Sequence, residues 1–64
     1  MDPNANLTEQ RALARDILVQ LERREQLDPE DVFRDCDRMA ELVLALDEWL
    51  HRGGFLPARW QHQK

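Results

Sequence analysis

Five acidic residues lie within ten positions in the middle of the chain, and clustered carboxylates are ligands that divalent cations prefer. They are Asp28, Glu30, Asp31, Asp35 and Asp37. If this stretch is helical, the spacing spreads the carboxylates around the helix instead of bringing them together. The glycine pattern of a calcium-binding loop is also absent. We therefore expect these side chains to cap a helix or to face solvent, and we expect no metal site.

The other side chains with metal-binding or nucleophilic chemistry are Cys36, His51 and His62. Their spacing is not that of zinc ligands, and no histidine is placed to activate the thiol. Cys36 is instead expected to be a small buried apolar residue. There is no Ser–His–Asp arrangement, and the two consecutive glycines follow a predicted helix, whereas a phosphate-binding loop would precede one. The sequence predicts a non-enzymatic protein with no catalytic residue, cofactor or metal.

A long helix is predicted over residues 29–52, and its ends are well marked. Asp28 can cap the start, and Pro29 suits the first helical position. Gly53 can adopt the left-handed conformation that ends a helix. We expect this helix to organise the rest of the chain.

Apolar residues of this helix recur in steps of four and three, which predicts a seam against a neighbouring helix. The seam residues are Val32, Cys36, Met39, Val43, Leu46 and Leu50. Residues 42–46 are apolar all round, although one neighbouring helix covers only one stripe. Leu44 would therefore stay exposed unless the C-terminal tail or a second chain covered it.

A first helix is predicted over residues 8–25, after a flexible N-terminus over residues 1–6. Thr8 is the expected cap, and Asn6 with Glu9 is an alternative capping pair. Because the link to the next helix is very short, the two helices are expected to pack antiparallel. The predicted apolar face consists of Leu13, Ala14, Ile17, Leu18 and Leu21.

Residues 53–64 form a C-terminal tail, of which residues 53–60 are too apolar to be left in solvent and residues 61–64 are expected to be frayed. Its two leading glycines allow a sharp reversal, so that its aromatic residues can fold back over the second helix or meet another chain. Both alternatives stay open. The candidate interface residues are Leu42, Leu44, Leu46, Trp49, Phe55, Leu56 and Trp60.

At 64 residues the chain forms one domain at most, and a domain of this size is marginally stable alone. Self-association is the natural way to bury more apolar area, with a dimer favoured. The net charge of −4 is divided into −1 over residues 1–27, −6 over 28–51 and +3 over 52–64. A mildly acidic chain is a poor nucleic-acid binder. The alternative function is nevertheless a nucleic-acid-binding regulator, which would use Arg11, Arg15, Arg23 and Arg24.

The cellular setting is expected to be cytoplasmic. No apolar run approaches the length of a membrane span, and no signal peptide is present. The single cysteine fits a reducing compartment. We expect no membrane partner.

The segment LDEWLHRGGFLPARW, residues 46–60, resembles the C-terminal end of small uncharacterised proteins encoded by phages of actinobacteria. The LTEQ opening at residues 7–10 and the LDP turn at residues 27–29 are similar in layout. The resemblance implies a host-cell cytoplasm and a phage accessory or regulatory factor that acts on a host or phage protein. It implies no activity and no site residue.

Taken together, the sequence predicts an all-α single domain. Its form is an antiparallel two-helix hairpin with an apolar tail, which dimerises into a four-helix arrangement and acts through protein–protein contacts.

Overall fold

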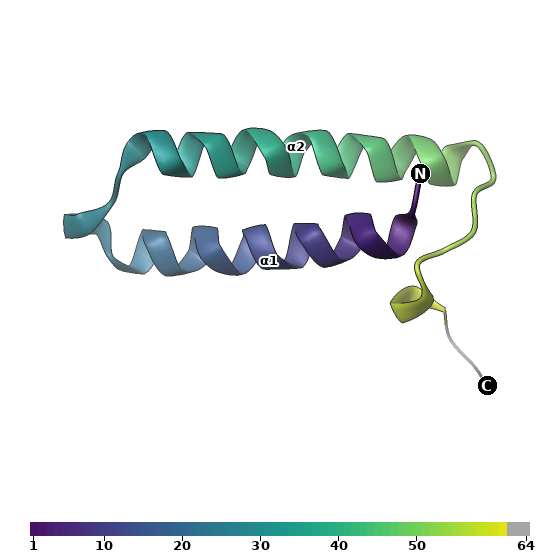
Figure 1. The fold of residues 1–64 in the computed structure, drawn as a ribbon, viewed down its shortest axis with the longest axis horizontal. Helices are drawn as coiled ribbons and strands as arrows, with labels where there is room; N and C mark the ends of the chain where they lie inside the picture. The colour runs from purple at the N-terminus through teal and green to yellow at the C-terminus, as the bar shows by residue number, and fades with distance from the viewer. Residues whose placement is uncertain (62–64) are drawn as a thin grey trace.

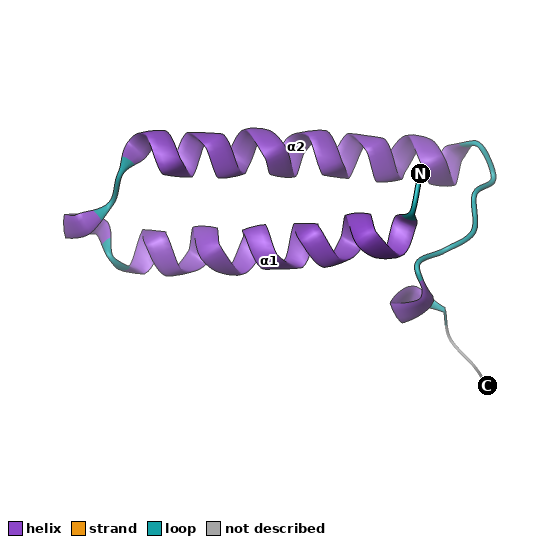
Figure 2. Cartoon of the chain, viewed as in Figure 1, coloured by secondary structure: helices purple, strands orange, loops and turns teal. Residues whose placement is uncertain are grey.

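The computed structural model describes residues 1–61 as two long helices that lie side by side, with a chain reversal between them (Figure 1). The elements are α1 (Pro3–Glu22), the 3-10 turn η1 (Arg24–Gln26), α2 (Pro29–His51) and the 3-10 turn η2 (Ala58–Trp60). Residues 1–61 contain no strand (Figure 2), which confirms the all-α prediction with two helices. The last residues of the predicted tail, including His62, lie outside the described part.

Helix α1 begins five residues earlier than predicted, at Pro3. Asp2 is the N-cap, and its Oδ1 accepts hydrogen bonds from Asn4 N at 2.9 Å and Ala5 N at 3.2 Å. Thr8 is not a cap, because its hydroxyl donates to the Asn4 carbonyl within the helix at 2.9 Å. The predicted start at Thr8 and the flexible segment over residues 1–6 are therefore wrong. The physical reason is that Asp followed by Pro supplies both an N-cap and a preorganised first position.

Helix α2 begins in the same way and ends one residue before the predicted limit. Asp28 Oδ1 accepts from Glu30 N at 3.0 Å, and Pro29 occupies the first helical position. Arg52 caps the end, and Gly53 follows with φ of 89°, the left-handed conformation that glycine adopts without a steric penalty. Two Asp–Pro pairs thus define the starts of both helices.

Polar side chains fix how the two helices face each other. Near the start of α1, the buried Asn6 donates from Nδ2 to the Leu42 carbonyl of α2 at 2.9 Å. Near its end, Gln20 donates from Nε2 to Asp35 Oδ2 at 2.9 Å. The molecule measures 44 × 25 × 14 Å. Its smallest extent is little more than the roughly 10–12 Å diameter of one helix, so the fold is a single layer of helices.

The buried hydrophobic residues of the described chain are Leu7, Leu42 and Leu46, and the predicted seam is therefore rotated. Leu42, which is not among the predicted seam residues, is 6% exposed, whereas the seam residues Cys36 and Val43 are exposed. The apolar arc of α2 is wider than one helix can cover, so several rotations bury leucines equally well. In the rotation that the structure has, the Leu42 carbonyl accepts a hydrogen bond from Asn6 of α1.

The predicted face of α1 is half correct. Leu13, Ala14 and Ile17 are half-buried, whereas Leu18 and Leu21 are exposed. Within residues 1–61, neither helix combines the length and the apolar character that crossing a bilayer would require.

Candidate interaction surface

The chain reverses after α2 against the side chain of Trp49. The Gly54 N–H donates to the Trp49 carbonyl at 2.9 Å, and a Cβ on Gly54 would overlap the indole ring. The Trp49 Nε1–H donates to the Phe55 carbonyl at 2.9 Å. The two aromatic rings pack edge to face, with centroids 5.4 Å apart and planes at 90°. Glycine at position 54 is thus what lets the tail pass so close to α2.

Beyond this reversal, the tail packs on the start of α1 (Figure 1). The Ala58 N–H donates to Asn4 Oδ1 at 2.6 Å. Pro57 and Pro3 are the largest fully buried side chains. The tail therefore folds back on its own chain and closes the end of the helix pair that carries the N-terminus. We call this the closed end, and the end at η1 the turn end.

The structure divides the seven predicted interface residues into two groups. Leu42 and Leu46 are only 6% and 4% exposed, because they form the core against α1, so they are not available to a partner. Trp49 is half-buried beneath the tail. The exposed members are Leu44, Phe55, Leu56 and Trp60. Leu44 and Trp49 are five residues apart, which places them about 140° apart around α2, so the seven do not form one surface.

The two sides of the seam between α1 and α2 differ in chemistry. One side is bridged by Arg38, which donates from Nε and Nη2 to the two carboxylate oxygens of Glu9 at 2.7 and 3.0 Å. Arg38 also pairs with Glu41 at 3.4 Å. The hydrogen bond from Arg38 lowers the pKa of Glu9, and that from Glu9 raises the pKa of Arg38. We call this the bridged side.

The opposite side of the seam is apolar and uncovered. Leu18 lies nine residues after Glu9, about 180° away around α1. Cys36 and Val43 lie about 160° and 140° from Arg38 around α2. The apolar stripe continues from there to the outer side of α2, where Phe33 is 71% exposed. We call this surface the open face and define it as Leu18, Leu21, Phe33, Cys36, Ala40, Val43 and Leu44.

Only Leu44 of the open face was among the predicted interface residues. The sequence does contain a signal for the α2 part, because Phe33, Ala40 and Leu44 follow one another in steps of seven and four and therefore share a helix face. Leu18 and Leu21 were missed for another reason. They have the spacing of core residues, and only the structure shows that nothing covers them.

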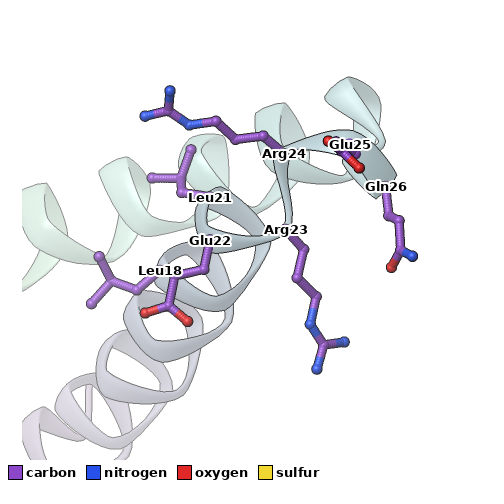
Figure 3. A pocket seen from close by; sticks show the side chains of 7 residues that line it. All are labelled: Leu18, Leu21, Glu22, Arg23, Arg24, Glu25 and Gln26. Atoms are coloured by element: carbon purple, nitrogen blue, oxygen red, sulfur yellow. The ribbon is translucent and has the colours of Figure 1, made fainter.

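A shallow hollow extends the open face at the turn end (Figure 3). Figure 3 shows Leu18 and Leu21 on one side of the end of α1, with Arg24 extending on the same side and Arg23 pointing away. The lining residues are Leu18, Leu21, Glu22, Arg23, Arg24, Glu25 and Gln26. Apolar side chains edged by charged ones are typical of a protein contact surface.

Several of the acidic residues considered as metal ligands cap a helix, form an ion pair or accept a hydrogen bond from the other helix. Asp28 caps α2, Asp31 pairs with Arg34, and Asp35 accepts from Gln20. No three His, Cys, Asp or Glu side chains within residues 1–61 lie close enough together to hold a metal ion. Cys36 was expected to be buried and is exposed, because the seam rotates it toward the open face.

Comparisons of the chain with protein-family models, with curated proteins and with solved structures find no match. The resemblance of residues 46–60 to small phage proteins therefore stays a prediction.

Proposed function

We propose that this chain is a small non-enzymatic interaction protein, an antiparallel helical hairpin whose open face packs against another protein. The observation that carries the proposal is the imbalance between core and surface. Among residues 1–61 the buried hydrophobic residues are Leu7, Leu42 and Leu46, whereas Phe33, Leu44 and Leu18 of the open face are 71%, 69% and 62% exposed. Contiguous exposed apolar surface on a small protein is typical of a site that a partner covers. Self-association into a four-helix dimer is the favoured form of this function.

The tail contributes a second set of candidate contacts. Phe55, Leu56 and Trp60 are exposed although the tail itself is anchored through Trp49 and Pro57. Aromatic side chains held on a fixed backbone are effective interface anchors, because little entropy is lost when they are covered. If the tail is a contact surface, Trp60→Ala weakens self-association or partner capture. If Trp60→Ala changes neither, Trp60 is not a contact residue.

Sedimentation over a range of concentrations tests the proposal, with a matched pair of variants. Leu44→Gln removes an apolar side chain from the open face, and Ala45→Gln places the same residue one position away, toward the bridged side. We expect the wild type to self-associate, Leu44→Gln to weaken this, and Ala45→Gln to leave it unchanged. A wild type that stays monomeric up to millimolar concentration would refute self-association as the function.

A nucleic-acid-binding regulator is the second candidate. Among residues 1–61, Arg11, Arg15, Arg23 and Arg24 form no ion pair. Arg15, Arg23 and Arg24 are exposed and can contact phosphates, whereas Nε and Nη1 of Arg11 are buried. Retention on DNA that falls steeply as salt rises would support this function. Absence of retention at low salt would exclude it.

The resemblance of the tail to small phage proteins supports a role as a phage accessory or regulatory factor in the host cytoplasm. Such a factor would act on a host or phage protein through the same exposed apolar residues. Capture of one defined protein by the wild type, and its loss with Leu44→Gln, is the expected result.

A further inference from the structure

We propose that the partner on the open face is a second copy of this chain, oriented so that α1 of each copy lies across α2 of the other. This inference rests on the proposed function and adds the identity and the orientation of the partner. Two observations carry it: the amount of surface that the single copy exposes, and the uneven distribution of charge between its two helices.

The exposed area has the size that one dimer interface would remove. A folded monomer of this chain's mass, 7.6 kDa, is expected to expose about 4,300 Å². The chain exposes 5323 Å². The surplus of about 1,000 Å² is close to the roughly 800 Å² that each partner contributes to a stable interface of standard size. A second copy would also supply the missing second layer of a fold that is 14 Å thick.

Charge selects between the possible orientations of the two copies. Helix α2 contains seven acids and two arginines, a net charge of −5, whereas residues 3–26, which contain α1, Arg23 and η1, carry four acids and four arginines and are neutral. Stacking α2 on α2 of the second copy would bring two strongly acidic helices together, which costs free energy through like-charge repulsion. Placing α1 across α2 of the other copy avoids this contact.

The unpaired charges on the open face agree with that orientation. Arg34 and Arg38, the arginines of α2, are already in ion pairs, while no arginine of α1 forms one within residues 1–61. Arg11 lies about 20° from Leu18 around α1, and Asp47 lies about 20° from Cys36 around α2. The α1 border of the open face therefore carries Arg11, whose Nε and Nη1 are buried in the single copy without a hydrogen-bond partner, and the α2 border carries the exposed Asp47. In a dimer whose two-fold axis runs parallel to the helices, the α1 border of each copy faces the α2 border of the other. Both turn ends then lie at the same end of the dimer.

Disulfide trapping tests the orientation, because the chain has a single cysteine on the open face. The native chain is mixed with a Leu18→Cys, Cys36→Ser variant under mild oxidation, and the products are identified by mass spectrometry. We expect the main product to join Cys36 of one copy to the thiol introduced at position 18 of the other. The matched control is Ala12→Cys, Cys36→Ser, which places the thiol at an exposed position on the other side of α1 and should give no mixed product.

The outcomes separate this inference from the proposed function. Predominance of products that join two identical chains would mean that like helices face each other, and would overturn the orientation. Dimers in sedimentation without any mixed product would place the interface elsewhere, overturning the inference while leaving self-association intact. A monomer at all concentrations would overturn the second copy as the partner. The proposed function would then survive only through capture of a different protein that Leu44→Gln abolishes.

Discussion

The closed end and the turn end of the same helix pair bury very different amounts of their apolar residues. At the closed end, Leu7, Leu42 and Leu46 are buried together with Pro3 and Pro57. At the turn end, Leu18, Leu21 and Phe33 have the same apolar character and are exposed. The difference is the tail, which adds a third element at one end only (Figure 1). Two helices side by side cannot enclose a core, and a further element is needed to complete it.

The largest expected effect comes from removing one leucine at each end. Leu46→Ala leaves a cavity beside α1, and we expect a loss of about 2–5 kcal/mol in the free energy of unfolding. Leu18→Ala removes a side chain that is 62% exposed, so we expect little change in the stability of the monomer. Urea unfolding followed by circular dichroism, at a concentration below any self-association, measures both. Equal losses would show that the two ends are packed alike and would contradict the comparison.

A second experiment makes the closed end resemble the turn end. In Gly54→Ala the new Cβ would overlap the Trp49 ring, so the tail must move away from α2. We expect a loss of about 1–3 kcal/mol, as for other overpacked sites. The near-ultraviolet circular dichroism of the Trp49–Phe55 pair should also weaken. Ala58→Gly is the control, because it changes an exposed tail residue without adding atoms. An unchanged aromatic signal in Gly54→Ala would show that the tail is not held by this contact.

Local signals explain which parts of this arrangement could be predicted. The start of α2 follows from Asp28 and Pro29, and its end from Gly53. Asp2 and Pro3 carry the same signal, but their place near a chain end predicts disorder, because chain ends are commonly disordered. Here the end is ordered because Pro3 is buried and Asn4 accepts a hydrogen bond from the tail. That contact joins residues 54 positions apart, and local sequence patterns do not reveal such pairings.

The rotation of α2 could not be predicted for a different reason. Apolar periodicity identifies a helix face only when the face is narrow, and the apolar arc of α2 extends from Leu42 past Val43 to Leu44. Within that arc, the side chain of Asn6 donates to the Leu42 carbonyl, a contact that fits the rotation in which Leu42 is buried. The candidate interface depends on the same rotation. In the structure Leu42, a predicted interface residue, is buried, and Cys36, a predicted buried residue, is exposed.

Asn6→Ala tests whether that polar contact sets the rotation at the closed end. The variant removes the donor that reaches the Leu42 carbonyl from α1, while that carbonyl keeps its hydrogen bond from the Leu46 N–H within α2. We expect a loss of about 1–2 kcal/mol, since the variant removes a buried hydrogen bond between the helices and also takes away the acceptor of the Gln10 side chain. Thiol labelling of Cys36 provides a second measurement, because a rotated α2 would protect this exposed residue. Unchanged stability together with unchanged labelling would mean that apolar packing alone fixes the rotation.

The smallest expected effect lies on the bridged side of the seam. Arg38 lowers the pKa of Glu9, so the ionised carboxylate is favoured in the folded state relative to the unfolded state. The stabilisation from this pair is therefore present above the ordinary glutamate pKa of about 4.3, and it is lost as the pH falls through the lower value of the folded state. Glu9→Gln should be slightly less stable than the wild type at pH 7 and equally stable at pH 2. Because both side chains are exposed, the difference at pH 7 should be small and should shrink further in high salt.

Unfolding curves of the wild type and Glu9→Gln at both pH values measure this difference in stability. Glu48→Gln is the control, because it removes an ion pair within α2. If Glu9→Gln lowers stability no more than Glu48→Gln does, the bridge between the helices adds nothing beyond a surface pair, and the open face alone distinguishes the two sides.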